Sequence, residues 1–358
     1  MKIAILGAGN GGQALAGYLS TKGFPVALFN RSEKRISYIK KKKGIQLCGL
    51  VNEFATIDTI TTDMKTVIEG ADLIMVVVPA QGHKYIARKC APHLSDGQII
   101  VLNPGRTGGA MEFRNTLLQC GMKKRIYLAE AQTFLFVSRA FEKEVRISGI
   151  KNSVPIAALP ACDTDTVVRV LQQVHESFEK AENVMETSLG NIGAIFHPTT
   201  MLFNIGRIES NSQFSYYYEG ITPQIARFLE QIDKERQSVA SELNINSPSA
   251  CQWLQKVYNA KGKSLYELIQ DNGKYRGVGS PTSLLHRYIL EDIPTGLVPM
   301  SSIGHHLGIQ TRVIDHVVGI CSQLYGINFR KVGRTVDSLG LADKKRDEIL
   351  DHISGEYA

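Results

Sequence analysis

Short apolar runs alternate with amphipathic stretches through the first half of the chain. Each run has the length of a strand, and each stretch between two runs carries apolar residues at helical spacing. The predicted strands are 2–6, 25–29, 72–78, 98–102 and 125–129, and the predicted helices are 10–22, 32–43, 81–94 and 109–120. Residues 73–78 are apolar on both faces, which is typical of a central parallel strand. The alternation therefore predicts an α/β domain with a parallel sheet covered by helices on both sides.

The pattern changes from about residue 187, where long helical stretches replace the alternation. These predicted helices are 187–207, 221–243, 250–259, 282–291, 300–306 and 310–325. A chain of 358 residues exceeds one ordinary domain. We therefore predict an α/β domain over 1–186 and an all-α domain over 187–358. The charged segment 344–358 is expected to form a peripheral helix or to fray.

The first predicted strand runs into a glycine-rich turn, GAGNGG, and then into the first predicted helix. A strand, G-x-G-x-x-G and a helix, in this order, form the fingerprint of a dinucleotide-binding Rossmann domain. Gly7 permits the tight turn, Gly9 lets the backbone approach a pyrophosphate, and Gly12 lets the helix pack on the strand. The helix N-terminus offers N–H groups and a partial positive charge to the phosphates. The sequence therefore predicts a bound dinucleotide.

The end of the second predicted strand indicates which dinucleotide is bound. NAD-selective domains place an Asp or Glu about 20 residues after the fingerprint, where it binds the ribose 2′-hydroxyl. This chain has Asn30 and Arg31 there, so no carboxylate repels a 2′-phosphate and Arg31 can bind one. Alternatively, Arg31, Lys34 and Arg35 only solvate the start of a helix. We favour NADP(H), with NAD(H) as the alternative.

Two further loops follow predicted strands at the edge of the sheet where ligands bind. Pro79 ends the third strand, and the glycine-rich segment 103–109 follows the fourth. The second loop is either a connecting turn or a cofactor contact. The predicted cofactor contacts are Gly7, Gly9, Asn10, Gly11, Gly12, Asn30, Arg31, Pro79, Asn103 and Gly105.

Composition limits the class of protein and its partners. Hydrophobic residues make up 43% and charged residues 21% of the chain, as in a soluble globular protein. The net charge of +7 suits anionic ligands, but no basic stripe interleaved with aromatic residues indicates nucleic-acid binding. The six cysteines are scattered without a C-x-x-C pair, which gives little support to a metal site or disulfides. With no signal peptide and no membrane-length apolar run, we expect a cytoplasmic protein, by default a homodimer.

A nicotinamide enzyme needs a proton donor or acceptor near the hydride centre. Among nine histidines, His197 has the most unusual setting, because it lies in an apolar helical stretch directly before a proline. A lone histidine of this kind is more often a core residue, and His286, His305 and His306 compete with it. On one interpretation, the polar segment 283–292 is a charged helix end. Alternatively, it faces the site, where its arginine can bind a substrate carboxylate and its aspartate can hold a histidine in one tautomer.

At these residues the chain resembles the opine dehydrogenases over nearly its whole length. It is most similar to the bacterial N-(1-D-carboxyethyl)-L-norvaline dehydrogenases, with octopine dehydrogenases more distant. The matching segments are Gly7–Gly12, Val77–Ala80, Leu102–Gly105, Thr107–Ala110, His197–Pro198, Tyr217–Pro223, Tyr275–Gly277, Arg287–Tyr288, Glu291–Asp292 and Thr295–Pro299. The N-(1-D-carboxyethyl)-L-norvaline dehydrogenases carry an acidic residue at the position of Asn30, and this departure favours NADP(H) here.

The resemblance implies a Rossmann domain followed by an octopine-dehydrogenase-type helical domain. From the two-domain pattern itself we expect the catalytic cleft to lie between the domains. The resemblance makes His197 the catalytic acid/base, Asp292 its orienting partner and Arg287 the residue that holds a substrate carboxylate. The implied reaction is the NAD(P)H-dependent condensation of an α-keto acid such as pyruvate with the amino group of an amino acid.

Two alternatives belong to other classes. A keto-acid reductase of the ketopantoate reductase type shares the two-domain plan but depends on a lysine where this chain offers His197. An NADP(H)-sensing protein would not need its polar groups to converge on the nicotinamide. The amino-acid substrate is not indicated, because Phe203, Phe214, Ile221 and Trp253 are equally suited to a pocket or to the helical core.

Overall fold

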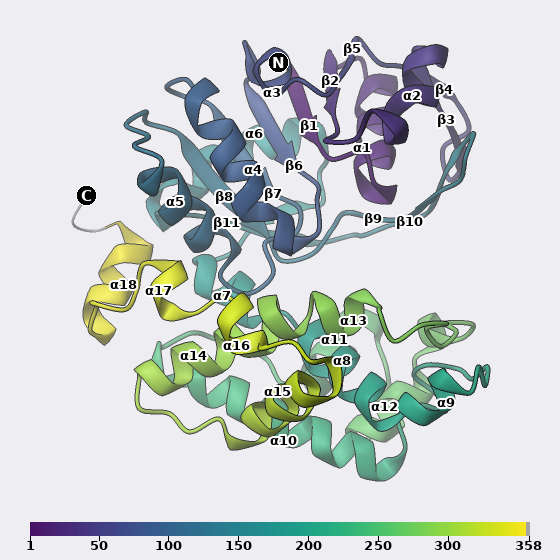
Figure 1. Ribbon diagram of the computed structural model, residues 1–358, viewed down its shortest axis with the longest axis vertical. Coiled ribbons are helices and arrows are strands. Elements are labelled where there is room, and N and C mark those ends of the chain that lie inside the picture. The colour runs from purple at the N-terminus through teal and green to yellow at the C-terminus, as the bar shows by residue number, and fades with distance from the viewer. Residues whose placement is uncertain (356–358) are drawn as a thin grey trace. The chain divides into compact units, whose positions relative to one another are not determined.

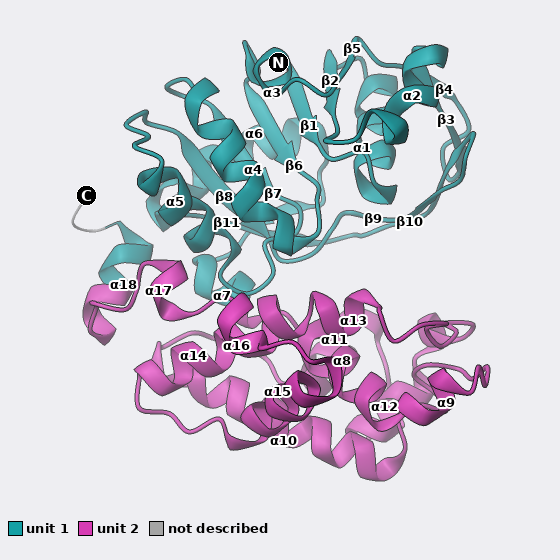
Figure 2. Cartoon of the chain, viewed as in Figure 1, with its two compact units in different colours: residues 1–188, 350–358 teal, residues 189–349 magenta. Residues whose placement is uncertain are grey.

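The computed structural model describes residues 1–355, and these form two compact units (Figure 2). Unit 1 comprises Met1–Ser188 together with the C-terminal segment from Leu350, and unit 2 comprises Leu189–Ile349. This division differs from the expected ranges 1–186 and 187–358, because the C-terminal segment returns to unit 1. Ile353 is buried, and a Cβ on Gly355 would lie 2.6 Å from Cβ of Pro160. The expected peripheral helix is α18 (Arg346–Ser354), and the last three residues, 356–358, lie outside the described chain.

Unit 1 is built on an eight-stranded sheet in the order β12-β11-β8-β7-β6-β1-β2-β5 (Figure 1). The six strands from β8 to β5 pair in parallel, whereas β11 runs antiparallel to β8. The strands are β1 (Ile3–Leu6), β2 (Val26–Phe29), β5 (Thr59–Thr61), β6 (Leu73–Val76), β7 (Ile99–Leu102), β8 (Tyr127–Ala131), β11 (Val154–Ala158) and β12 (Phe178–Lys180). All five predicted strands are therefore present, and the predicted parallel sheet is confirmed.

The helices of unit 1 follow the predicted alternation. Because β1 and β6 are buried on both faces, helices must cover the sheet on both sides. The helices are α1 (Asn10–Thr21), α2 (Glu33–Lys42), α3 (Met64–Ile68), α4 (His83–Cys90), α5 (Gly109–Gln119), α6 (Thr164–Val174) and α7 (Val184–Leu189). The four predicted helices correspond to α1, α2, α4 and α5, and short 3-10 turns flank α4 at Ala80–Gly82 and Ala91–His93.

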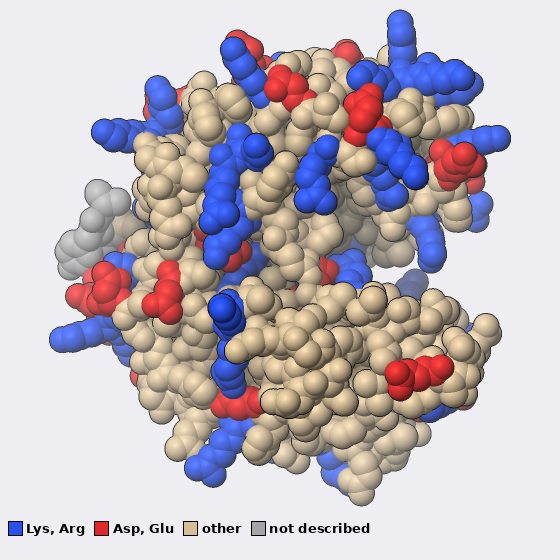
Figure 3. All heavy atoms as spheres, viewed as in Figure 1, with Lys and Arg blue, Asp and Glu red and all other residues tan. Residues whose placement is uncertain are grey.

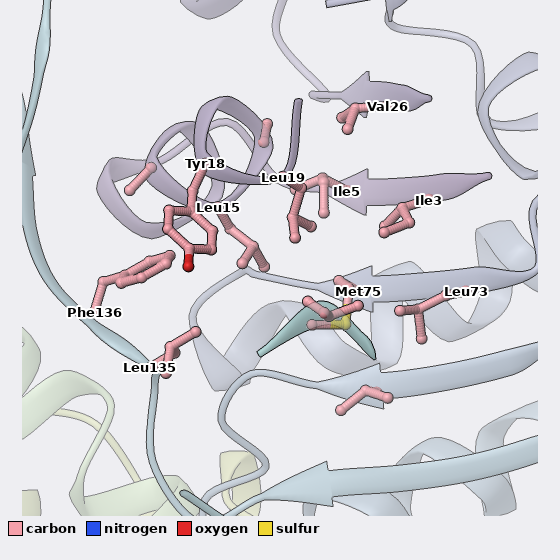
Figure 4. Packing of buried hydrophobic residues seen from close by; sticks show 14 of the residues in the cluster. Ile3, Ile5, Leu15, Tyr18, Leu19, Val26, Leu73, Met75, Leu135 and Phe136 are labelled. Carbon is pink, nitrogen blue, oxygen red and sulfur yellow. The ribbon is translucent and has the colours of Figure 1, made fainter. Parts of the chain in front are cut away.

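A second, four-stranded sheet in unit 1 was not predicted. Its order is β4-β3-β10-β9, with β3 (Gly44–Gly49), β4 (Phe54–Thr56), β9 (Phe136–Ala140) and β10 (Val145–Ile150). β3 and β10 pair in parallel across a long sequence separation, so local periodicity does not reveal the pairing. This sheet packs on α1, where Tyr18 meets Phe136 with ring centroids 5.1 Å apart (Figure 4). The core of unit 1 therefore encloses α1 between β1 and the smaller sheet.

Unit 2 is helical, as predicted. Its helices are α8 (Gly193–Phe203), α9 (Ile205–Glu209), α10 (Pro223–Glu242), α11 (Ala250–Tyr258), α12 (Leu265–Asp271), α13 (Arg287–Leu290), α14 (Val298–His306), α15 (Arg312–Tyr325), α16 (Phe329–Val332) and α17 (Val336–Leu339). The expected helix 187–207 is divided among α7, α8 and α9.

The expected helix 282–291 is wrong except for the single turn α13. Residues 282–285 are bends and not helix, and just before them the chain pairs with the segment around Phe214, where Tyr216 donates its backbone N–H to Val278 O over 2.8 Å and Ser280 donates to Phe214 O over 2.9 Å. A π-helical turn, Ile293–Leu297, then leads directly into α14. Such turns are rare and are frequent at functional sites.

Positive side chains lie mainly over unit 1 on the face shown in Figure 3, with acidic side chains among them. Within residues 1–355, no helix has both the length and the apolar character needed to cross a membrane. The same residues contain no group of His, Cys, Asp and Glu side chains arranged to hold a metal ion.

Candidate functional site

In the glycine-rich turn between β1 and α1, three glycines differ in the space that a side chain would have. Gly7 has a φ of +119°, and a Cβ there would lie 2.3 Å from Val77 O. A Cβ on Gly12 would lie 1.7 Å from Gly7 O, so the close packing of α1 on the turn excludes any side chain. Gly9 differs, because no atom lies within 4 Å of the position that its Cβ would take. This open position at the N-terminus of α1 fits the pyrophosphate of a dinucleotide.

Two predicted cofactor residues in this turn have structural contacts. Oδ1 of Asn10 accepts a hydrogen bond from the backbone N–H of Ala140 over 3.1 Å, which ties α1 to β9. A Cβ on Gly11 would lie 2.9 Å from the ring of Phe134. The side chain of Asn10 is therefore engaged within the protein, and its backbone N–H at the helix start is the group available to a phosphate.

Two arginines follow β2, Arg31 just after the strand and Arg35 on α2. Asn30 accepts the backbone N–H of Ala8 over 3.1 Å and donates to Ser32 O over 3.0 Å. Arg31 is exposed and lies over the ring of Tyr85, 5.6 Å from its centroid. Arg35 donates from Nε to Ala8 O over 3.2 Å. Arg35, which sequence reasoning assigned only to a solvated helix, therefore contacts the turn directly.

The predicted residues after β6 and β7 differ in their surroundings. Pro79 is exposed and begins the 3-10 turn that follows β6. Asn103 is buried; its Nδ2 donates to Val101 O over 2.9 Å, and its Oδ1 has no hydrogen-bond partner within residues 1–355. Gly105 is required by packing, since a Cβ there would lie 2.3 Å from Oε2 of Glu130.

Glu130 is a buried carboxylate that the sequence analysis missed. It accepts the backbone N–H of Ala110 over 2.7 Å and the hydroxyls of Thr187 and Ser188 over 2.7 and 3.0 Å. It therefore fastens the N-terminus of α5 to α7. The signal in the sequence was an acidic residue next to the predicted apolar strand 125–129.

In unit 2 the structure brings His197 and Asp292 together. Nδ1 of His197, on α8, lies 2.8 Å from Oδ2 of Asp292, at the start of the π-helical turn. The side chain of Asp292 is fully buried, whereas 18% of the histidine side chain is exposed. A buried carboxylate in this position holds the imidazole in one orientation.

Three tyrosines that the sequence analysis did not assign surround His197. Tyr217 places its hydroxyl 3.1 Å from Nε2, and the Tyr288 ring stacks on the imidazole with centroids 4.1 Å apart. Tyr216 donates its hydroxyl proton to the backbone oxygen of His197 over 2.6 Å. Burial, followed by the neighbouring tyrosines, raises the pKa of Tyr217 well above its usual value. Tyr217 and Tyr288 lie in the segments that carried the family resemblance, which was the available signal.

Arg287 lies beside this group, at the start of α13. Its Nε and Nη2 bind Oε2 of the buried Glu291 over 2.8 and 2.6 Å. Burial opposes its charge, but the carboxylates of Glu291 and Asp292 outweigh burial and raise the pKa of Arg287. More than half of the side chain, 57%, is exposed, and its Nη1 makes no hydrogen bond within the described chain. Arg287 is therefore held by one carboxylate while keeping donors for a second one.

The competing histidines have other partners. Nδ1 of His286 accepts the backbone N–H of Tyr288 over 3.4 Å, and burial lowers the pKa of His286. His305 lies 2.9 Å from Asp315 with half of its side chain exposed, and His306 lies 2.7 Å from Lys344 O. None of these three has the arrangement of His197, in which both ring nitrogens meet polar side chains.

The four apolar pocket candidates do not form one cluster. Phe203 is half exposed and contacts Phe228, and Arg207 lies over the ring of Phe214. Ile221 is fully buried. Trp253 is linked to the site through rings, because it contacts Tyr258, which contacts Tyr275, which stacks on Tyr217.

Comparison with known proteins places the chain among related enzymes. Residues 180–325 match the family model of the α-helical domain of NAD/NADP octopine/nopaline dehydrogenases, and residues 2–119 match the N-terminus of NAD-dependent glycerol-3-phosphate dehydrogenases. The chain is 38% identical to an opine dehydrogenase of Arthrobacter sp. (strain 1C) over 345 residues, which are 95% of either chain.

Solved structures show the same fold. Octopine dehydrogenase in complex with NADH and agmatine matches with a TM-score of 0.84 at 19% identity, over 100% of this chain and 99% of that one. Yersinopine dehydrogenase with bound NADP⁺ matches with a TM-score of 0.72 at 16% identity, over 99% and 98%. With the identity to the Arthrobacter enzyme over almost the entire length, these findings show that the chain belongs to the opine dehydrogenases, a family of NAD(P)-dependent oxidoreductases.

Proposed function

We propose that the protein condenses an α-keto acid such as pyruvate with the amino group of an L-amino acid, and reduces the product to an N-(carboxyalkyl) amino acid. The observation that carries this proposal is the contact between Nδ1 of His197 and the buried carboxylate of Asp292 at 2.8 Å. This pair supplies a proton acceptor and donor in a chain of the opine dehydrogenase family.

His197 takes the proton that the amine must lose before it attacks the keto carbon. An ammonium group has no lone pair, so condensation begins only after this transfer. Asp292 stabilises the imidazolium that forms, and the same proton later helps the carbinolamine hydroxyl to leave as water. The reverse oxidation uses the same groups in the opposite order.

Arg287 holds a substrate carboxylate. Glu291 orients its guanidinium, and the exposed Nη1 edge forms charge-assisted hydrogen bonds with the carboxylate. A carboxylate fixed in this way limits which face of the carbon–nitrogen double bond is open to reduction.

The cofactor is NADP(H) in preference to NAD(H). The open position at Gly9 and the α1 N-terminus suit its pyrophosphate, and Arg31 and Arg35 suit a 2′-phosphate. When bound, the reduced nicotinamide supplies the hydride for the carbon–nitrogen double bond. Asn10, Pro79, Asn103 and Gly105 complete the proposed cofactor contacts. NADH bound to octopine dehydrogenase and NADP⁺ bound to yersinopine dehydrogenase are both precedents within this fold.

One assay tests the reaction and the cofactor together. Purified protein is mixed with pyruvate, each of the twenty amino acids, and NADPH or NADH, and cofactor oxidation is followed at 340 nm. We expect oxidation that requires both pyruvate and an amine, a higher kcat/KM with NADPH, and a secondary amine dicarboxylate by mass spectrometry. Oxidation with pyruvate alone that no amine accelerates would indicate a keto-acid reductase, and cofactor binding without any turnover would indicate a sensor.

The proposal extends to assembly and location. All six cysteines are unpaired thiols, which suits a reducing cytoplasm. A homodimer is the commonest closed assembly of a soluble enzyme. Light scattering after size-exclusion chromatography tests the homodimer, and a monomer would contradict it. Fractionation of the source cells tests the location, and an exported protein would contradict it.

A further inference from the structure

Both ring nitrogens of His197 are engaged in unit 2. Nδ1 lies 2.8 Å from Asp292, and Nε2 lies 3.1 Å from the hydroxyl of Tyr217. An ionised carboxylate only accepts hydrogen bonds, so Nδ1 carries the proton and the neutral ring accepts the Tyr217 O–H at Nε2. The ring nitrogen that is left to exchange a proton with a substrate is therefore covered by a phenol.

Tyr217 is held firmly in this position. Its ring stacks on Tyr275 with centroids 3.9 Å apart and planes 12° from parallel. The turn that follows it is tied to the C-terminal end of α8, because Asn204, directly after the helix, donates to Gly220 O over 2.8 Å. Only 7% of Tyr217 is exposed. The hydroxyl is thus a fixed part of the site and not a surface group that meets the histidine by chance.

The chemistry of a buried phenol suits proton relay. Burial raises the pKa of Tyr217 well above its usual value, so the hydroxyl keeps its proton throughout the neutral range. A phenol accepts one hydrogen bond while it donates another. It can therefore take a proton on its oxygen as it passes its own proton on, without becoming charged.

We propose that Tyr217 is the residue that contacts the substrate amine and that it relays the amine's proton to His197, a role that rests on the proposed condensation. In the forward direction, the ammonium N–H gives its proton to the Tyr217 oxygen while the Tyr217 O–H proton moves to Nε2. A neutral amine, an intact phenol and an imidazolium result. When the carbinolamine loses its hydroxyl, the imidazolium returns a proton through Tyr217 to that oxygen, the carbon–oxygen bond breaks and water leaves.

Tyr217→Phe tests the relay, because it removes the hydroxyl and keeps the stacked ring. Tyr275→Phe is the matched control: it deletes the same group from the stacking partner, whose hydroxyl makes no hydrogen bond within the described chain. At pH 7 we expect kcat/KM for the amino acid to fall about 10²-fold in Tyr217→Phe and less than about twofold in Tyr275→Phe. The defect of Tyr217→Phe should narrow as pH rises, because more of the amine then arrives already neutral.

A structural role of Tyr217 predicts different results. A loss of equal size at every pH, an unchanged kcat/KM, or a gain from uncovering Nε2 would each overturn the relay. Nitrogen-15 NMR of His197 tests the contact without turnover. The chemical shift of Nε2 should change in Tyr217→Phe and stay the same in Tyr275→Phe. An unchanged chemical shift in both variants would overturn the contact itself. Wild-type protein without amine-dependent turnover would instead contradict the proposed function, while the NMR result still reports separately on the contact between Tyr217 and His197.

Discussion

The carboxylate of Asp292 lies 2.8 Å from Nδ1 of His197 and is fully shielded from solvent, whereas the histidine keeps 18% of its side chain exposed. A carboxylate on one ring nitrogen makes the other one the basic nitrogen. The pair therefore has a buried anchoring side and a reactive side, and Tyr217 lies on the reactive side.

Removing either member of the pair should reduce turnover without preventing cofactor binding. We expect His197→Ala to lower kcat by about 10²–10⁴-fold, because general acid/base assistance is lost. Asp292→Asn should also lower kcat, since its amide can donate to Nδ1 and favour the wrong tautomer. Steady-state kinetics with a fluorescence titration of NADPH checks both effects. His305→Ala is the control, because His305 pairs with Asp315 and not with Asp292. Near-normal turnover of His197→Ala would disprove its assignment as the catalytic acid/base.

Arg287→Lys should chiefly weaken binding of the carboxylate substrate. Lysine keeps the charge but loses the planar fork and the double contact with Glu291. We expect the KM for the keto acid to rise about tenfold or more, which corresponds to roughly 1.4 kcal/mol, with a smaller change in kcat. Initial rates at varied keto-acid concentration measure the changes in KM and kcat separately. Arg227→Lys, an exposed arginine on α10, serves as the control, and an unchanged KM in Arg287→Lys would contradict the role.

Gly9→Ala and Gly12→Ala should separate cofactor binding from folding. A Cβ on Gly9 meets no protein atom within 4 Å, and its φ of −75° suits alanine. We therefore expect Gly9→Ala to keep the melting temperature of the free protein but to weaken NADPH binding. Gly12→Ala should lower stability by about 1–3 kcal/mol, because its Cβ would overlap Gly7 O at 1.7 Å. Thermal melts and NADPH titrations measure both, and unaltered NADPH affinity in Gly9→Ala would contradict the placement of the pyrophosphate.

Neutralising the arginines after β2 should change the choice of cofactor. Arg31→Ala and Arg35→Ala are each expected to raise the KM for NADPH several-fold and to leave the KM for NADH nearly constant, because only NADPH carries the 2′-phosphate. The ratio of kcat/KM for the two cofactors is the measurement. Lys41→Ala, an exposed basic residue of α2, is the control for net charge. An equal loss of kcat/KM with both cofactors would show that these arginines do not bind the 2′-phosphate.

Lys151 should make the stability of the protein depend on pH above neutrality. Burial, together with the nearby Arg106, lowers the pKa of Lys151 to about 8. The unfolded chain therefore binds more protons than the folded one between about pH 8 and its ordinary value of 10.5, so stability should rise with pH across this window.

Replacing this lysine tests that dependence. Lys151→Met should raise the free energy of unfolding at pH 7 by at most about 3–4 kcal/mol and flatten the rise with pH, since the partly buried charge is gone. Urea unfolding at pH 7 and at pH 9.5 checks this, with Lys41→Met as the exposed control. A lower stability of Lys151→Met at pH 7 would contradict the expectation.

Much of unit 1 could be predicted because its signals are local. Strand β1, the turn from Gly7 to Gly12 and helix α1 follow one another in the chain, and each has its own pattern of apolar and glycine residues. The smaller sheet could not be predicted, since β3 and β10 pair across about a hundred residues and the alternation in β10 covers only its first four positions. The overpredicted helix 282–291 failed for a similar reason, because residues 282–285 form bends and Leu284 O accepts a hydrogen bond from the hydroxyl of the distant Tyr325.

The sequence by itself determined the dinucleotide fold, the helical second half and the family, because periodicity, glycine spacing and ordered motifs are all written along the chain. Its residue patterns also pointed to His197 and to the segment 283–292 as candidates, but the roles of His197, Asp292 and Arg287 came only from the resemblance. The tertiary structure decided that His197 and Asp292, 95 residues apart, share a hydrogen bond, and it brought Tyr217 and Tyr288 against the same ring. Such contacts are decided by how α8, the turn at Tyr217 and the π-helical turn pack together, and no local pattern encodes the distance between their side chains.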